Sequence, residues 1–113
     1  MGASENPDRY SNLAIKKLLG QGHKVMALGR RRGYVDSVEI MTEKAPADDI
    51  DTVTMYLGAA HQQEYYDYIL SLKPRRIIFN PGAENEDLED LARANGIQPI
   101  EACTLVLLST GQY

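Results

Sequence analysis

One segment near the start of the chain carries residue types that suit phosphate binding. Gly2-Ala3-Ser4-Glu5-Asn6-Pro7 leads directly into a helix-like stretch at Tyr10–Leu19. A glycine permits a tight turn, and the unpaired N–H groups of a helix N-terminus attract anions. The alternative is that Gly2 only permits the turn while Ser4 or Asn6 caps the helix. Capping and anion binding use the same N–H groups, and the pattern favours a phosphate site.

A second segment is basic. Arg30, Arg31 and Arg32 stand between Gly29 and Gly33, after an apolar run that predicts a strand. In dinucleotide-binding folds an acid at this place binds ribose hydroxyls, whereas an arginine binds a ribose phosphate. No acid follows the predicted strand, which disfavours NAD and fits CoA, with its 3′-phosphate, or NADP. The alternative is that these arginines are solvated surface.

The elements that must position these segments alternate between strand and helix. The predicted order is a helix at Ser11–Leu19, strands at Lys24–Leu28 and Ser37–Met41 (a small edge strand), a loop or single turn at Ala45–Ile50, a strand at Thr52–Leu57, a helix at His61–Leu72, a strand at Arg76–Phe79, a helix at Asn85–Asn95, a strand at Ile97–Ile100, and a short helix or turn at Cys103–Leu108. This alternation predicts an α/β, Rossmann-like three-layer fold with a mostly parallel sheet. Its first strand is expected to be truncated, with only Met1 and Gly2 assigned to it.

The turns that follow the predicted strands should meet at one edge of that sheet. They are Gly2–Ser4, Gly29–Gly33, Gly58–Ala60 and Asn80–Ala83. Ligands of open parallel sheets bind beyond the carboxyl ends of the strands. This expected clustering is the main argument from the residues for a binding site.

Length and composition limit what else the chain can be. It has 113 residues, enough for one domain, with 43% hydrophobic and 25% charged residues, as in ordinary globular proteins. The net charge of −4 argues against nonspecific nucleic-acid binding. One cysteine excludes an internal disulfide and a cysteine-based zinc cluster. We find no membrane span and no signal peptide, so a cytoplasmic protein is expected.

The sequence predicts no catalytic residues and no metal site. It contains no G-x-S-x-G element, no P-loop lysine and no His/Glu metal pattern. The acidic residues Glu84, Glu86, Asp87, Glu89 and Asp90 stand at a helix start, where they complement the helix dipole. They are interpreted as a solvated face.

Three segments together resemble the CoA-binding domain family of small stand-alone proteins. They are Gly2–Ser11, Asn80–Asn85 and Glu101–Val106. The family is similar in fold to the N-terminal domain of the succinyl-CoA synthetase alpha subunit, and the resemblance covers nearly the whole chain. The synthetase's second domain, with its phosphorylated histidine, has no counterpart here, so the ligase reaction does not transfer.

The resemblance implies a single CoA-binding domain over residues 1–113, with CoA as its ligand. The implied binding residues are Gly2, Ala3, Ser4, Asn6 and Tyr10 at the pyrophosphate, Arg30 and Arg31 near phosphates, Gly58 and Ala59 in the third turn, and Pro81, Gly82 and Ala83 in the fourth. The family often has prolines in the third turn, where this chain has Gly58-Ala59-Ala60. The expected function is binding of CoA or an acyl-CoA without independent catalysis. The alternatives are an NADP-linked or partner-dependent acyl-CoA enzyme, and an interaction module whose nucleotide site has decayed.

Several side chains have two readings that the sequence leaves open. Cys103 is a small buried hydrophobe or a thiol that could form a mixed disulfide with CoA. His61 is a surface residue or a ligand contact, and His23 is structural or exposed. Tyr65, Tyr66 and Tyr68 share a predicted helix and suit core packing or contact with a second copy, more than base stacking; a homodimer is therefore possible.

Overall fold

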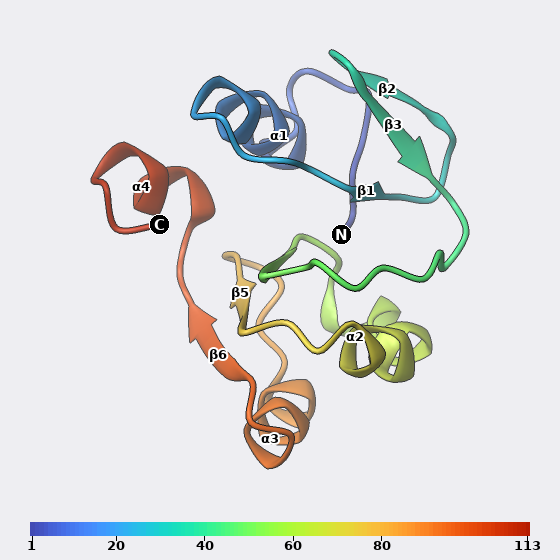
Figure 1. Cartoon of the computed structure of the whole chain (residues 1–113), viewed down its shortest axis with the longest axis vertical. Coiled ribbons are helices and arrows are strands. Elements are labelled where there is room, and N and C mark those ends of the chain that lie inside the picture. The colour runs from blue at the N-terminus through green and yellow to red at the C-terminus, as the bar shows by residue number, and fades with distance from the viewer. The chain divides into compact units, whose positions relative to one another are not determined.

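A computed structural model describes the whole chain, residues 1–113. The chain folds into two compact units, residues 1–44 with 104–113, and residues 45–103 (Figure 1). The first unit contains α1 (Tyr10–Gly20), β1 (Ala27–Leu28), β2 (Gly33–Val35), β3 (Val38–Met41) and α4 (Thr104–Ser109). The second contains β4 (Thr52–Met55), the 3₁₀ turns η1 (Ala59–His61) and η2 (Gln63–Tyr65), α2 (Tyr66–Leu72), β5 (Arg76–Phe79), α3 (Glu86–Ala94) and β6 (Gln98–Glu101).

The sheet of the first unit has the order β1-β3-β2. The pair β1 and β3 is parallel, whereas β2 and β3 form an antiparallel hairpin. Ala3 adds an isolated parallel bridge to Gly29. A small apolar cluster of Ile15, Ala27, Val35, Val38 and Ile40 stabilises this unit.

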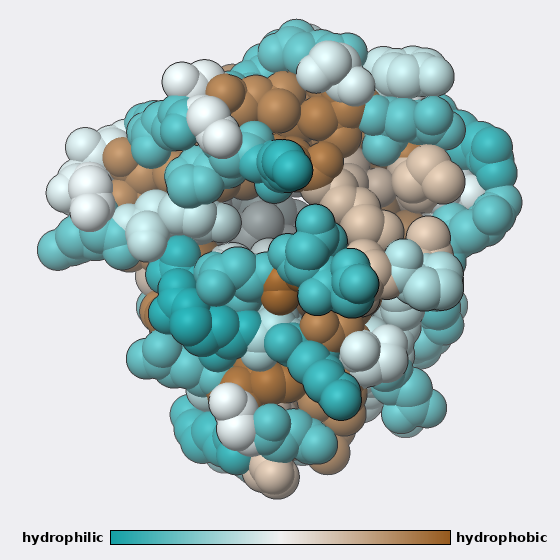
Figure 2. All heavy atoms as spheres, in the orientation of Figure 1, coloured by the Kyte–Doolittle hydropathy of each residue, from teal (hydrophilic) through white to brown (hydrophobic).

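α4 is held against α1 by side-chain contacts. The Lys17 ammonium donates to the hydroxyl of Ser109, and the amide of Gln21 donates to the Leu108 carbonyl at 3.3 Å. Part of α1 stays exposed: Tyr10 keeps 70% and Leu13 40% of its surface accessible. Figure 2 shows a visible face covered largely by hydrophilic residues, with hydrophobic residues at the surface near α1.

The sheet of the second unit is wholly parallel, in the order β4-β5-β6. Its central strand β5 is buried at all four positions, as expected for a parallel strand with both faces covered. Ile77, Ile78 and Phe79 are completely buried. A mostly parallel α/β architecture is therefore confirmed, and strand Arg76–Phe79 has the predicted bounds.

Two predicted elements are wrong. The segment Ser37–Met41 is not an edge strand, because β3 lies between β1 and a strand that the sequence analysis missed, β2. The predicted helix His61–Leu72 is α-helical only from Tyr66. Its first half consists of two 3₁₀ turns, and the Gln62 side chain between them is completely buried.

Candidate functional site

The first loop begins at the carboxyl end of β1. The N–H groups of Gly2 and Ala3 both donate to the carbonyl oxygen of Leu28, at 2.9 and 3.0 Å. Gly2 has φ of +90°, a left-handed conformation that favours glycine. The sequence therefore has a glycine where the chain turns away from the sheet towards α1.

Ser4 and Asn6 shape this loop and do not cap α1. The Ser4 hydroxyl accepts from the Asn6 N–H at 3.1 Å, and Asn6 Oδ1 accepts from the Asp8 N–H at 3.0 Å. The N-cap residue of α1 is Arg9, which makes no side-chain cap. The capping alternative is thus wrong, and the first N–H groups of α1, those of Tyr10 and Ser11, have no side-chain acceptor.

Asn12, on α1, holds the first loop through its side chain. The sequence analysis did not predict this role. Its Nδ2 donates to the Ser4 carbonyl oxygen at 2.9 Å, and the residue is 2% exposed. It lies on the buried face of α1 with Ala14, Ile15 and Leu18. A polar residue on an apolar helical face was the available signal, since buried amides need a hydrogen-bond partner.

The arginine loop (residues 29–33) contacts the first loop (residues 2–7) at both ends of the arginine loop. A Cβ atom on Gly29 would lie 2.5 Å from the Ala3 carbonyl oxygen and 2.9 Å from Ile40 Cγ2. A Cβ atom on Gly33 would overlap the carboxyl group of Glu5. Glycine is needed at Gly29, where the neighbour is backbone, whereas at Gly33 the neighbour is the side chain of the exposed Glu5. The two loops that the sequence singles out for phosphate binding are therefore in direct contact.

The three arginines are all exposed, and they differ in their partners. Arg32 pairs with Glu43 at 2.5 Å, with both side chains more than half exposed. Arg31 makes no hydrogen bond or ion pair. Its guanidinium is available to a ligand without loss of an internal contact.

In the second unit, the turn after β4 is open. Gly58 has an extended backbone, φ −63° and ψ 153°, and precedes η1. A Cβ atom there would meet nothing within 4 Å. Ala59, the first residue of η1, is exposed. These small side chains leave the backbone accessible.

The turn after β5 is fixed by its own hydrogen bonds. The Ala83 N–H donates to the Asn80 carbonyl at 2.8 Å, and the Gly82 N–H donates to the Glu84 carboxylate at 2.8 Å. Pro81 and Gly82 are exposed, whereas Ala83 is only 1% exposed. Of these three predicted site residues, Pro81 and Gly82 face outward and the Ala83 methyl packs inside.

A buried polar network joins these two turns. Gln62 Nε2 donates to the Leu57 carbonyl at 2.7 Å and to the Ala83 carbonyl at 2.8 Å. Its Oε1 accepts from Asn85 Nδ2 at 3.0 Å, and the same nitrogen donates to the Tyr66 hydroxyl at 2.7 Å. Every polar atom of the Gln62 amide is thus in use, as buried amides require. The network sets the spacing of the two turns.

Asn80 adds a second link between the strand ends. Its Nδ2 donates to Thr54 Oγ1 and to the Met55 carbonyl oxygen, both at 2.9 Å. Asn80 is 2% exposed and immediately follows β5. The sequence analysis treated Asn80 only as part of a turn; its place directly after a buried strand was the signal for this role.

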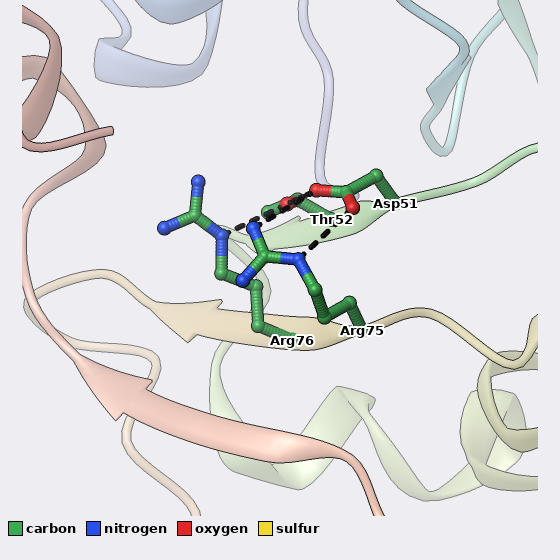
Figure 3. Close-up of polar contacts among 4 residues, drawn as sticks. All are labelled: Asp51, Thr52, Arg75 and Arg76. Atoms are coloured by element: carbon green, nitrogen blue, oxygen red, sulfur yellow. Dashed lines mark hydrogen bonds and ion pairs between the residues drawn. The ribbon is translucent and has the colours of Figure 1, made fainter.

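A different polar cluster lies at the amino ends of β4 and β5 (Figure 3). Arg75 pairs with the Asp51 carboxylate, with Nε 3.1 Å from Oδ1. The hydrogen bond from Arg75 lowers the pKa of Asp51 below its usual value. Arg76 Nε donates to Thr52 Oγ1 at 2.9 Å, and Arg76 is 6% exposed. Because ligands of parallel sheets bind at the carboxyl ends, this cluster is part of the scaffold.

The predicted acidic surface of α3 needs one correction. Glu86, Asp87 and Asp90 are exposed, but Glu89 is buried to 7% exposure. Burial raises the pKa of Glu89, and the hydrogen-bonded carboxyl of Glu101 raises it further. Glu89 directly follows the buried Leu88, and its side chain turns to the sheet at β6 rather than to solvent.

Several side chains that the sequence left open now have contacts. Tyr66 joins the Gln62 network, and the Tyr68 hydroxyl donates to the Ala45 carbonyl at 2.6 Å, so both serve packing within the second unit. His23 is exposed, with its ring 5.1 Å from that of Tyr113 in an edge-to-face arrangement. Cys103 is a half-buried free thiol. His61 is exposed at the end of η1.

The structure brings the predicted residues together in two groups. In the first unit, Gly2, Ala3, Ser4 and Asn6 lie in a loop that contacts the arginine loop. In the second unit, the turns with Gly58, Ala59 and Pro81–Ala83 are joined through Gln62. We find no group of three or more His, Cys, Asp or Glu residues arranged to hold a metal ion. None of the helices has the length and apolar character needed to cross a bilayer.

Parallel strands whose carboxyl ends lead into glycine-bearing turns define a Rossmann-like α/β protein. A model of the CoA-binding domain matches residues 1–109, almost the entire chain. The chain belongs to the CoA-binding domain family.

Solved structures agree with this assignment of the fold. The chain is 46% identical to a crystal structure described only as an uncharacterized protein, with 99% of this chain and 93% of that chain covered and a TM-score of 0.97. A protein from Thermus thermophilus is 18% identical, with 100% and 87% covered and a TM-score of 0.87. A hypothetical protein from Pyrococcus horikoshii OT3 is 20% identical, with 96% and 78% covered and a TM-score of 0.87. No functionally curated protein matches the sequence.

Proposed function

We propose that residues 1–113 act as one domain that binds CoA or an acyl-CoA, without catalysing a reaction alone. Membership of the CoA-binding domain family supports this function. The observation that carries it is the contact between the first loop and the arginine loop at Gly29 and Gly33. Backbone N–H donors and guanidinium groups are thereby gathered on one unit, as a ligand with a pyrophosphate and a ribose phosphate requires.

The pyrophosphate is assigned to the first loop. The N–H groups of Tyr10 and Ser11 begin α1 without a side-chain cap, and the loop before them is braced by Ser4 and Asn6. A braced loop loses little conformational entropy when a ligand binds. The positive end of the helix dipole adds a favourable interaction with the phosphates.

The ribose 3′-phosphate is assigned to Arg31, with Arg30 beside it. Arg31 has no internal partner to give up, whereas Arg32 is paired with Glu43. A guanidinium binds phosphate through parallel charge-assisted hydrogen bonds. The turns that contain Gly58, Ala59, Pro81, Gly82 and Ala83 are kept as proposed ligand contacts within the second unit, because small residues allow close approach to the backbone.

A thermal-shift panel with CoA, acetyl-CoA, NADP, NAD and ATP, followed by calorimetry, tests the proposal. A ligand that binds only the native state stabilises it by about 2.7 kcal/mol at 100 times Kd. We expect CoA to give the largest shift. A shift with NADP alone would favour a reductase, and no shift with any ligand would favour an interaction module.

Two matched variants test the phosphate assignment. Arg31→Ala should weaken CoA binding by about tenfold or more, because a charge-assisted hydrogen bond is lost. Arg32→Ala removes the same charge from the same loop, but its guanidinium is already paired with Glu43, so we expect a loss below about threefold. Equal losses in the two variants would contradict the assignment to Arg31.

A further inference from the structure

Glu5 links the first loop to the arginine loop through its side chain. Its Oε2 accepts a hydrogen bond from the backbone N–H of Tyr34 at 2.9 Å. Its carboxyl group also fills the space that a Cβ atom on Gly33 would need. Tyr34 and Gly33 begin β2, directly after the three arginines. Glu5 therefore fastens the far end of the arginine loop, while the bridge between Ala3 and Gly29 fastens the near end.

This contact places a carboxylate beside a basic segment. No acidic residue directly follows the predicted strand Lys24–Leu28. In the folded chain, Glu5 of the first loop places a carboxylate at the end of the arginine loop. Arg32 is already paired with Glu43. The Glu5 carboxylate lies at the end of the loop that contains Arg30 and Arg31. An acid near the ribose favours hydroxyl groups over a phosphate, the opposite of what arginine favours.

We propose that Glu5 is a specificity-determining residue, whose carboxylate holds the arginine loop in place and limits how strongly the site prefers a ligand with a ribose phosphate. The proposal rests on the proposed function, since it assumes that CoA binds with its ribose phosphate at the arginine loop. Glu5 thus has two effects that can be separated. Its oxygen atom positions the loop, and its negative charge opposes the phosphate.

Glu5→Gln separates these effects. A glutamine keeps an oxygen that can accept from the Tyr34 N–H, but it carries no charge. We expect the ratio of the Kd of 3′-dephospho-CoA to the Kd of CoA to rise by about threefold to tenfold at low ionic strength. This change should shrink as salt is added, because the charges are near the surface. Glu5→Ala also loses the hydrogen bond, so its ratio should rise less.

Asp36→Asn is the matched control. Asp36 lies in the hairpin turn between β2 and β3, at the opposite end of the hairpin from Gly33. It has φ of +51°, which asparagine also adopts readily. The substitution removes the same single charge from the same unit. Because Asp36 lies at the far end of the hairpin, we expect the ratio of the two Kd values to stay within about twofold of that of the unsubstituted protein.

Gly33→Ala tests the same proposal by another route. The added methyl must displace the Glu5 carboxyl, with no change in the number of charges. The ratio of the Kd of 3′-dephospho-CoA to the Kd of CoA should rise here too. This variant therefore gives an answer even if Glu5→Gln does not fold. Calorimetry with CoA and 3′-dephospho-CoA measures both constants for every variant.

The outcomes are distinct. A raised ratio in Glu5→Gln with an unchanged ratio in Asp36→Asn supports the proposal. Equal ratios in Glu5→Gln, Gly33→Ala and the unsubstituted protein, with CoA still bound, overturn it and leave the proposed function standing. If the unsubstituted protein binds neither ligand, the proposed function fails and the role of Glu5 fails with it.

Discussion

Gln62 donates a hydrogen bond of 2.8 Å to the carbonyl oxygen of Ala83, 21 residues further along the chain. The same nitrogen donates to the carbonyl of Leu57, so one amide joins the segment after β4 to the turn after β5. These are the two turns of the second unit in which the sequence predicts ligand-binding residues. Their spacing depends on a side chain that is itself completely buried.

Replacing Gln62 by leucine should destabilise the protein by about 3 kcal/mol, because the carbonyl oxygens of Leu57 and Ala83 lose their Gln62 donor and Asn85 Nδ2 loses one of its two acceptors. Urea denaturation measures the change. Gln63→Leu is the control: Gln63 is exposed and should change stability by no more than about 0.5 kcal/mol. Equal midpoints for the two variants would show that the Gln62 network does not stabilise the fold.

Gly29→Ala should destabilise the first unit. The new methyl group would meet the Ala3 carbonyl oxygen, a backbone atom, at 2.5 Å and Cγ2 of the completely buried Ile40 at 2.9 Å. We expect a loss of about 2 kcal/mol, as for overpacking in a core. The loss should appear as a lower melting temperature.

Gly20→Ala gives the opposite result and serves as the control. Gly20 is the last residue of α1, and a Cβ atom there meets nothing within 4 Å. Alanine should stabilise the helix by roughly 0.5 kcal/mol or more. If the Gly29→Ala and Gly20→Ala proteins had the same melting temperature, the first loop would not be packed tightly against Gly29.

The fold was predictable where burial and chain pattern coincide. Strand β5 stands out through the apolar run Ile77-Ile78-Phe79 before Asn80, and the structure reproduces its predicted bounds. Strand β2 was missed because Gly33-Tyr34-Val35 is too short for a period to emerge. Its place depends on hairpin pairing with β3, a tertiary contact that local propensity does not encode.

The sequence predicted the turns of the candidate site, but it did not predict the buried side chains that hold those turns in place. Glycines and arginines stand out in the sequence, and the resemblance to a family points to them. Asn12, Gln62 and Asn85 are polar residues that pattern analysis assigns to the surface, yet all three are buried. Asn12 and Gln62 bind the carbonyl groups of Ser4 and Ala83, and Asn85 binds Gln62 itself, so their partners are brought near only by the folded chain.

Arg75 and Arg76 are neighbours with opposite exposure, and they should differ in their effect on stability. Arg75 forms an ion pair with Asp51 in which both side chains are more than 60% exposed. Arg75→Ala should therefore cost less than about 1 kcal/mol. Arg76→Ala removes a buried side chain and its bond to Thr52 Oγ1, so we expect about 2 kcal/mol.

The pH dependence of this pair has a defined sign. Because the pKa of Asp51 is lowered in the folded state, its contribution is present above the usual value of 3.8 and is lost as the pH falls through the folded pKa. The difference between Arg75→Ala and the unsubstituted protein should therefore vanish in acid. Denaturation curves from pH 2 to 7 measure it, and a difference that persists at the lowest pH would mean that Arg75 acts through packing and not through the ion pair.

Glu89 should have the opposite pH dependence. Burial and the neighbouring Glu101 carboxyl raise the pKa of Glu89 above 4.5, while Arg93, 3.9 Å away, and the Asn85 backbone oppose the rise only in part. The folded state then binds more protons than the unfolded state above pH 4.5. The stability that Glu89 contributes is complete below that pH and is lost as the pH rises through the folded pKa.

Glu89→Gln should therefore raise stability at pH 7 and flatten its dependence on pH above 4.5, because a glutamine is neutral throughout and can still hydrogen-bond to Glu101. Glu86→Gln is the control on the same helix: Glu86 is exposed in the first turn, so its loss removes a favourable interaction with the helix dipole and should lower stability by about 0.5 kcal/mol. Urea denaturation between pH 4.5 and 7.5 measures both variants. If Glu89→Gln is less stable than the unsubstituted protein at pH 7, the ionised Glu89 carboxylate is stabilised by Arg93, and the direction argued from burial is wrong.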